Sequence, residues 1–231
     1  MFQNFQNKSE IYNNVSLFVN EKEIEKSSVV TYLGVLLDEH LTWDNHINYI
    51  SSKISRNIGI LYRIKYFVPL RILFMMYNAF ILPHIMYCII IWANQFPSKL
   101  EKIYRLQKKA LRICSNSDYY APSKPIFNHF QTLNIFDINN LKICTIMQQY
   151  LLNSLPEYLM QMFSLNFHIH DYNTRSNQLF HQSKVTSHAL LKSIRFVGPT
   201  TWNSLPPSLR NIQFVNSFKN KYKHLLLSQY S

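Results

Sequence analysis

Glycine and cysteine are both scarce in this chain, and their scarcity excludes two classes of protein. Only 3 of the 231 residues are glycine and 3 are cysteine, whereas hydrophobic residues make up 47%. Such a composition favours a packed globular core over a disordered chain. Cys88, Cys114 and Cys144 are odd in number and far apart, which argues against a disulfide framework. Residues 1–4 carry no secretory signal pattern, so we expect an intracellular protein, cytoplasmic or nuclear.

Paired acids suited to metal-dependent chemistry are missing as well. Enzymes that use two metal ions hold them a few ångströms apart with paired carboxylates, and no aspartate here stands next to another. Asp38 and Glu39 form the only adjacent acidic pair, in a position typical of a solvated turn. A loose histidine cluster lacks the closely spaced cysteines of structural zinc sites. Its members are His168, His170, Asp171, His181 and His188. We therefore predict no catalytic residue and no metal site.

No apolar run reaches the length of a membrane span. Residues 70–93 are the most hydrophobic stretch, but Arg71, Asn78 and His84 interrupt it. The longest clean run, residues 85–93, is roughly half of the about 20 residues that a membrane helix needs. We predict a buried pair of helices over residues 70–93.

Acidic residues become rare after the first fifth of the chain. Residues 1–44 contain 7 acids and 3 bases, a balance of −4, and residues 45–231 contain 5 acids and 21 bases, a balance of +16; together they give the net charge of +12. After Asp171 no acid occurs. A positive field of this kind favours a polyanionic partner such as nucleic acid. Its phosphates release counterions when basic side chains bind to them. An anionic membrane surface would attract the same positive charge.

The N-terminal part has the pattern of β-structure. Residues 15–19 alternate in part, and residues 29–37 form an almost continuous apolar run that is typical of a buried strand. Gly34 within that run indicates a bulge or a close backbone approach.

Helical spacing begins at Asp44, a residue type that commonly caps helices. Isoleucine or leucine recurs every three or four residues as far as Leu61, which predicts a helix with one apolar face. Lys53, Arg56 and Arg63 fall together on another face of this helix. They are our first candidate nucleic-acid contacts.

Proline marks the boundaries of further helices. Pro69 is well placed to begin a helix that runs to about Leu82, and Pro83 either ends it or begins the next. Pro156 similarly predicts the start of a shorter helix that extends through Phe163.

A second basic helix is predicted over residues 98–113. Ser98 and Glu101 have the spacing of a capping box, and Leu106 is one of the apolar residues expected to face the core. Bases recur on another face at intervals of three and four residues, and we call this row the basic rail. It consists of Lys102, Arg105, Lys109 and Arg112. The rail is interpreted as a phosphate-binding surface, with a solvated charged face as the open alternative.

The remaining chain is expected to be helical at both ends and loop-rich between. Asp137 predicts a helix start, with an apolar face interpreted as core, and the helix should extend through Asn153. Residues 164–216 lose clean periodicity, with short strands possible at Val185 and at residues 194–197.

Two features near the C-terminus carry specific expectations. Ser217 is expected to cap a last helix with an inward apolar face, made of Phe218, Tyr222, Leu225 and Leu226. Trp202, between proline-containing segments, is expected to be buried. Stacking on a nucleic-acid base is the alternative for this ring.

Several short blocks of sequence, spread over most of the chain, are informative in the order in which they occur. They are YLGVLLDEHLTWDNHI (32–47), FVP (67–69), MYNAFILP (76–83), Tyr87, Trp92, LQKKALR (106–112), YNTR (172–175), GP (198–199), WNSLP (202–206), LR (209–210) and SFK (217–219). In this order they resemble the C-terminal part of reverse transcriptases from non-LTR retrotransposons of the jockey-like and CR1-like class. Cys88 and Ala93 stand where the related sequences usually have glycine.

The resemblance implies a mainly α fold with three parts. Residues 1–43 would be β-strands left from the polymerase palm, residues 44–116 a helical thumb-like bundle, and residues 117–231 a loop-rich, helical, basic C-terminal region. In an intact relative, palm carboxylates bind Mg²⁺ and the thumb holds the template–primer hybrid. This chain lacks those carboxylates, so we expect a fragment without polymerase activity or a cofactor of its own. Its expected remaining role is binding of an RNA template or a DNA–RNA hybrid through Lys53, Arg56, Arg63 and the basic rail.

Two other classes of function stay open. The chain could be a helical protein-interaction remnant without a nucleic-acid role, which undetectable or salt-insensitive RNA binding would favour. A membrane-surface protein that uses residues 70–93 and the basic tail is the less favoured class, and flotation with liposomes would detect it. The oligomeric state is not predicted.

Overall fold

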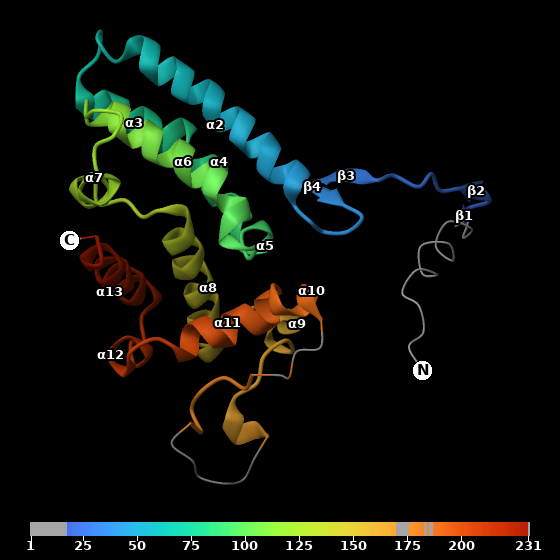
Figure 1. The fold of residues 1–231 in the computed structure, drawn as a ribbon. Helices are drawn as coiled ribbons and strands as arrows, with labels where there is room; N and C mark the ends of the chain where they lie inside the picture. Colours follow the sequence, from blue (N-terminus) through green and yellow to red (C-terminus); the bar gives the residue numbers. More distant parts are fainter. Residues whose placement is uncertain (1–17, 170–175, 183, 185–186, 231) are drawn as a thin grey trace, which may run out of the picture. The chain divides into compact units, whose positions relative to one another are not determined.

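The computed structural model of the chain describes residues 18–169, 176–182, 184 and 187–230 (Figure 1). The chain divides into two compact units, Met1–Trp43 and Asp44–Ser231. Helices make up 59% of the chain and strands 7%. This confirms the mainly α expectation, whereas the thumb-like identity and the three-part domain division stay predictions. The strand predicted at Val185 lies outside the described residues.

The described part of the N-terminal unit contains two β-hairpins. Their strands are β1 (Phe18–Val19), β2 (Lys22–Glu23), β3 (Val29–Tyr32) and β4 (Val35–Asp38). β1 pairs with β2 and β3 with β4, both antiparallel. The prediction of one buried strand over residues 29–37 is wrong, because the run turns back at Leu33 and Gly34. Their φ angles of 46° and 77° suit a two-residue hairpin turn, in which glycine is favoured.

Asp38 has a structural role at the end of the second hairpin. Its carboxylate accepts hydrogen bonds from the backbone N–H groups of Thr42 (2.8 Å) and Trp43 (2.9 Å). Burial raises the pKa of Asp38, but the hydrogen bonds outweigh that effect and the net pKa is lowered. The acid therefore holds the turn in place and is more than a solvated side chain.

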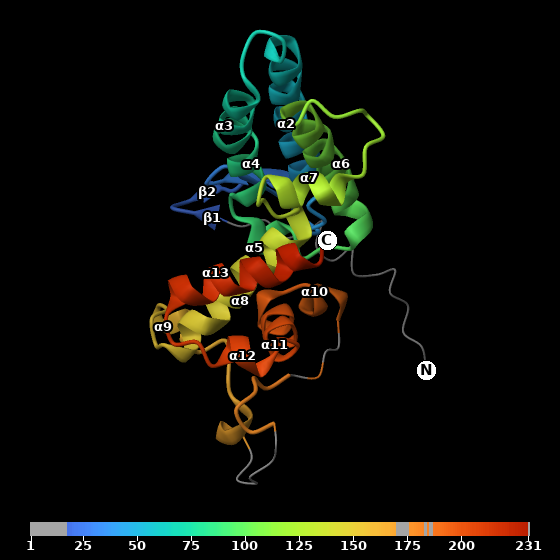
Figure 2. The ribbon, with the colours of Figure 1, turned by 90° about the vertical axis from the view of Figure 1, so that its left-hand side faces the viewer.

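The second unit is built from helices. The longer ones are α2 (Asp44–Ile64), α3 (Leu70–Phe80), α6 (Pro97–Cys114), α8 (Ile135–Leu151), α11 (Ile194–Asn203) and α13 (Val215–Ser228). The shorter ones are α4 (Leu82–Met86), α5 (Ile89–Trp92), α7 (Ser123–His129), α9 (Glu157–Met160), α10 (His188–Leu191) and α12 (Pro207–Arg210), with a 3-10 turn, η2, at Asn166–His168. Within this unit α2, α3 and α6 gather at one end, and α8, α11 and α13 at the other (Figures 1 and 2).

Helices α2 and α6 are parallel neighbours (Figure 2). Asp44 pairs with Lys99 at 2.8 Å near the start of both helices, and Asn48 accepts a hydrogen bond from Lys102 at 2.8 Å one turn later. Because these contacts follow the same order along both helices, α2 and α6 run in the same direction. Both helices also pack against α3. Because parallel neighbours that pack on the same helix share an inner side, their outer faces point the same way.

Residues 70–93 form three helices, α3, α4 and α5. Their buried side chains include Leu73, Tyr77, Ile81, Ile85, Ile89 and Trp92, so the prediction of buried helices is confirmed. The predicted number of two is wrong, because Cys88 adopts a left-handed backbone with φ 49° and separates α4 from α5. Within the part of the chain that the structure describes, no helix combines the length and apolar character of a membrane span.

We expect Cys88→Gly to raise the free energy of unfolding by roughly 0.5 kcal/mol. A residue with a Cβ loses about 1–2 kcal/mol in the left-handed conformation, and the extra entropy that glycine loses on folding offsets about 0.5–1 kcal/mol of that gain. Ala93 provides the matched control, because its φ of −90° makes no demand for glycine. Ala93→Gly should therefore destabilise. Urea unfolding of both variants measures the difference, and a less stable Cys88→Gly protein would contradict the strain argument.

A buried glutamine joins α6 to α3 and to the start of α8. The Gln107 side-chain amide donates to the Tyr77 hydroxyl (3.0 Å) and to the Leu133 carbonyl (2.9 Å), and its oxygen accepts from the Ile135 N–H (3.0 Å). Burial raises the pKa of Tyr77 to about 12, so this hydroxyl stays protonated. The sequence predicts Leu106 as an inward residue, but Leu106 is only half-buried and Gln107 is fully buried. An apolar pattern cannot identify such a residue, because its burial depends on three partners outside α6.

Two helix starts lack the serine caps that the sequence predicts. α6 begins at Pro97, with Phe96 in the capping position and no side-chain cap. Proline is favoured at a first helical position because its missing N–H needs no partner there. Ser98 therefore lies inside the helix, and the predicted capping box is wrong. α13 likewise begins at Val215, so Ser217 is not its cap.

The start of α8 is capped by Asn134, three residues before the predicted Asp137. The Asn134 side-chain oxygen accepts from the N–H groups of Phe136 (2.9 Å) and Asp137 (3.1 Å). The Tyr230 hydroxyl donates to the Asp137 carboxylate, and Asn134 donates to the same hydroxyl at 2.7 Å. Burial raises the pKa of Asp137, although its hydrogen bonds to Tyr230 and Asn134 act in the opposite sense. This network ties the C-terminal end of the chain to α8.

The segment before Trp202 is helical, because residues 194–197 begin α11. The strand predicted there is wrong. Gly198 lets α11 approach α8 closely, since a Cβ at this position would lie 2.6 Å from the Met147 sulfur. Trp202 is only 1% exposed, which confirms its expected burial. In α13 the inward residues are Phe218, Tyr222, Leu226 and Leu227. Leu225, predicted to face inward, is exposed.

Candidate nucleic-acid interface

The three candidate bases of α2 lie in different surroundings. Arg56 and Arg63 are exposed on the side opposite the buried residues, and no hydrogen bond or ion pair engages either side chain among the described residues. Lys53 is half-buried, with its amine 4.4 Å from the centre of the Tyr49 ring. Burial, together with the charge of Lys53, lowers the pKa of His84 on α4. Lys53 therefore faces α4, and only Arg56 and Arg63 share the outer side.

Two bases of the rail, Lys102 and Arg112, make hydrogen bonds within the fold. Lys102 donates to the Asn48 side chain at 2.8 Å, across the contact between α6 and α2. Arg112 donates from two guanidinium nitrogens to the Ala121 carbonyl, at 3.0 and 2.9 Å. This double hydrogen bond fixes the chain that follows α6, so Arg112 acts as a positioning residue.

The other two rail bases, Arg105 and Lys109, are exposed on the outer side of α6. Arg105 lies 3.5 Å from Glu101 in an exposed i,i+4 pair, an arrangement that contributes only about 0.3–0.5 kcal/mol and is easily exchanged. No hydrogen bond or ion pair engages the Lys109 side chain within the described ranges. Both side chains are therefore available to an anionic partner.

Together these residues form one surface, which we call the outer basic face. It consists of Arg56, Arg63, Arg105 and Lys109. Because α2 and α6 run parallel with their outer sides pointing the same way, all four side chains lie on one side of the pair. Arg56 and Arg63, seven residues apart, are separated by about 10 Å along their helix. Between Asp44 and Glu101 the sequence contains no acid to offset this charge.

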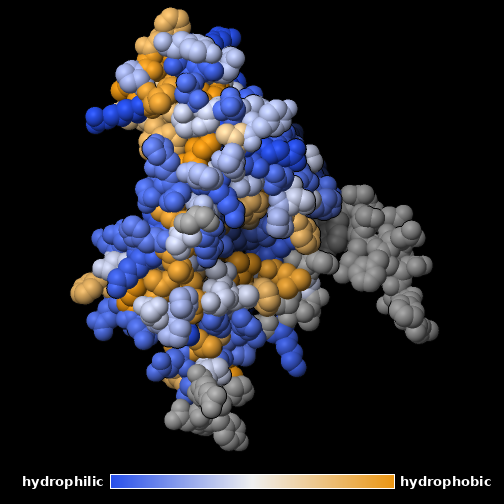
Figure 3. Space-filling view, turned by 60° about the vertical axis from the view of Figure 1, so that its left-hand side comes forward, coloured by the Kyte–Doolittle hydropathy of each residue, from blue (hydrophilic) through white to orange (hydrophobic). Residues whose placement is uncertain are grey.

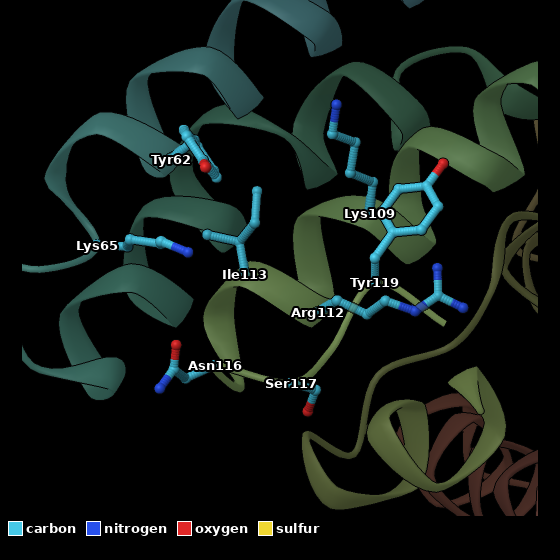
Figure 4. Close-up of a pocket in the computed structure, with 8 residues that line it drawn as sticks. All are labelled: Tyr62, Lys65, Lys109, Arg112, Ile113, Asn116, Ser117 and Tyr119. Atoms are coloured by element: carbon cyan, nitrogen blue, oxygen red, sulfur yellow. The ribbon is translucent and has the colours of Figure 1, made fainter. Parts of the chain in front are cut away.

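A pocket of about 150 Å³ lies where α2 and α6 end (Figure 4). Six of its lining residues are Tyr62, Lys65, Lys109, Arg112, Ile113 and Tyr119. Tyr62 belongs to the last turn of α2, Lys65 follows that helix directly, and Tyr119 comes from the loop after α6. The pocket thus adjoins the outer basic face, and Lys109 belongs to both.

Exposed hydrophobic side chains gather at the same end of the unit, around the connection from α2 to α3 (Figure 3). Phe67 is 84% exposed, and Tyr66 is nearly as accessible. The Lys65 amine lies 4.7 Å from the centre of the Tyr62 ring and 4.6 Å from that of Tyr66. A cation held over two rings keeps its N–H donors available to a further acceptor.

Metal ligands and buried cysteines can be judged only in the described part of the chain. No group of three or more histidine, cysteine, aspartate or glutamate residues comes together there in a way that could hold a metal ion. His170 and Asp171 of the histidine cluster lie outside the described residues. Burial raises the pKa values of Cys114 and Cys144 to about 12 each, so both thiols are neutral. Neutral buried thiols are poor nucleophiles.

Sequence reasoning missed Tyr62, Lys65 and Tyr119 as site residues. The stretch Tyr62-Arg63-Ile64-Lys65-Tyr66 does place two basic residues between two tyrosines, which is a signal for nucleic-acid binding. The candidate bases follow from helical spacing, which gives no signal for residues at a helix end or in a loop.

Comparison with known proteins finds a distant relative. The chain is 21% identical over 124 residues to a probable RNA-directed DNA polymerase from the transposon X-element of Drosophila melanogaster. The match covers 52% of this chain but only 14% of that protein. No family model matches the sequence, and no solved structure matches the chain. The similarity supports an origin related to reverse transcriptases.

Proposed function

We propose that this chain is a thumb-like, nucleic-acid-binding part of a non-LTR retrotransposon reverse transcriptase of the jockey-like or CR1-like class. Its function would be to hold a template–primer duplex by the phosphate backbone. The observation that carries the proposal is the outer basic face, where four bases from two parallel helices share one side. The distant similarity to a transposon polymerase supports the same function.

Binding of this type follows from simple electrostatics. Lysine and arginine side chains that meet phosphates displace condensed counterions, so the affinity falls steeply with salt. Phosphate contacts position a protein on a duplex but carry no sequence information. An RNA–DNA hybrid should therefore bind with weak sequence preference, and RNA template and DNA primer strands should contribute alike.

Nucleotide addition is assigned to another part of the polymerase. The paired carboxylates that hold two metal ions have no counterpart among adjacent residues of this sequence. In an intact relative those carboxylates belong to the palm and bind Mg²⁺. The residues of this chain would hold the duplex, and no catalytic residue or cofactor is assigned to them.

The test is a titration of a labelled RNA–DNA hybrid with the purified chain at several salt concentrations. Each phosphate contact changes the slope of log affinity against log salt by about −0.9 on duplex DNA, so four contacts predict roughly −3 to −4. The same mixture with Mg²⁺ and deoxynucleotides should show no primer extension.

Three outcomes would contradict the proposal. Undetectable or salt-insensitive binding would favour a helical protein-interaction role. Flotation with anionic liposomes, without hybrid binding, would favour a membrane surface. Extension that is abolished by a mutation in this chain would show that it carries catalytic residues.

A further inference from the structure

The pocket at the ends of α2 and α6 has a chemistry that the outer basic face lacks. Its cations are Lys65, Lys109 and Arg112, and no carboxylate is among its lining residues. Arg112 is held by the Ala121 carbonyl, so the loop that carries Tyr119 is anchored to α6. The site therefore combines three positive charges with an aromatic ring carried by an anchored loop.

Two exposed tyrosines flank the pocket. Tyr62 is 56% exposed and Tyr119 is 67% exposed. Figure 4 shows Tyr62 on one side of Ile113 and Tyr119 on the other. Aromatic rings left accessible around an apolar floor offer a surface on which another planar ring can pack.

The size of the pocket limits what it can take. A volume of about 150 Å³ is below the roughly 300–1,000 Å³ of pockets that enclose a drug-sized ligand. One planar group with a neighbouring anionic group suits this space better than a whole dinucleotide cofactor. A base and its phosphate have that combination.

Helix electrostatics account for only part of the site. Bases near helix C-termini interact favourably with the macrodipole, by about 0.3–1 kcal/mol. This explains Arg112, which lies in the last turn of α6. It does not explain why two tyrosines of the pocket are left accessible.

We infer that this pocket binds one unpaired nucleotide of a single-stranded nucleic acid. The base packs on Ile113 beside the rings of Tyr62 and Tyr119, and the phosphate is bound by Lys65 and Lys109. The inference rests on the proposed nucleic-acid function and deepens it. The outer basic face holds duplex, while the pocket holds the strand where pairing ends.

The test compares two labelled strands of equal length, a uridine-rich RNA and an abasic strand with the same phosphates. The unaltered chain should bind the base-bearing strand more tightly. Stacking on an aromatic side chain contributes enough affinity that Tyr62→Ala and Tyr119→Ala should each weaken uridine-rich RNA binding about 5-fold or more. Binding of the abasic strand should not change in Tyr119→Ala, which leaves the contact of Lys65 with the Tyr62 ring in place. Lys65→Gln should weaken binding of both strands.

Controls keep the result interpretable. Tyr158, an exposed tyrosine on α9 outside the pocket, provides Tyr158→Ala, which should leave both affinities unchanged. Tyr62→Leu keeps apolar bulk but removes the aromatic face, so it should weaken binding of uridine-rich RNA in the same way. It tests the loss of the ring if the alanine variant folds poorly. Thermal melting of each variant verifies its fold.

Several results would overturn the inference without touching the proposed function. They are equal affinity for the two strands, equal weakening of both by the tyrosine variants, or binding to phosphatidylserine vesicles that Tyr119→Ala reduces. Failure of the proposed function looks different, because hybrid, RNA and abasic strands would then all fail to show salt-dependent binding.

Discussion

Trp202→Ala is expected to lower the free energy of unfolding by about 3–5 kcal/mol. The ring is 1% exposed, with its centre 6.3 Å from that of Phe180 in an edge-on contact and 5.4 Å from that of Phe218. These neighbours belong to the loop before α10 and to α13. Truncation would therefore leave a cavity where three segments distant in sequence meet.

An effect of this size is a large share of the about 5–15 kcal/mol that stabilises a typical domain. Thermal and urea unfolding of the variant measure it, and a marked fall in melting temperature is expected. Trp202→Phe keeps an aromatic ring and should cost less, while the exposed-site variant Tyr158→Ala should melt like the parent. The opposite pattern, an unchanged melting temperature with weaker single-strand binding, would make Trp202 a binding residue.

Replacing Arg56, Arg63, Arg105 and Lys109 together by glutamine is expected to flatten the salt dependence of hybrid binding by about three to four units of slope. All four side chains are exposed on the outer basic face, so the fold should tolerate the change. Measurement of affinity at several salt concentrations, alongside circular dichroism, separates lost contacts from lost structure.

A matched control separates local contacts from net charge. Lys124, Lys142, Arg195 and Lys221 are also exposed, and they lie on α7, α8, α11 and α13. Their replacement by glutamine removes the same total charge from other helices. This control should lower affinity only through the long-range field and leave most of the slope intact. If both variants flatten the salt dependence equally, the outer basic face is a solvated charged surface and not a phosphate-binding one.

The structure alters what is expected of the basic rail. All four of its bases are candidates on helical spacing alone, but Lys102 and Arg112 are engaged by Asn48 and by the Ala121 carbonyl. Arg56 and Arg63 come from a second helix. The outer basic face has the same number of basic residues as the basic rail, but its residues come from two helices.

Residue spacing alone determined the burial pattern of α2 and the helical nature of the basic segments, and the proline-containing segments around Trp202 predicted its burial. The isoleucine spacing along α2 matches its buried residues Ile47, Ile50, Ile54 and Ile58. Periodicity succeeds here because burial of apolar area drives folding, and a helix repeats its inward positions every 3.6 residues. The charge asymmetry of the chain is likewise a property of the sequence alone.

Tertiary structure decided which polar groups are available and where the helices begin. Gln107 is buried because Tyr77, Leu133 and Ile135 supply its three hydrogen-bond partners, and none of them lies on its own helix. Side-chain hydrogen bonds depend on partners that folding brings together. Spacing along one helix therefore cannot distinguish a positioning residue such as Arg112 from an available basic residue such as Lys109. The pocket at Tyr62 and Tyr119 likewise exists only because two parallel helices end side by side.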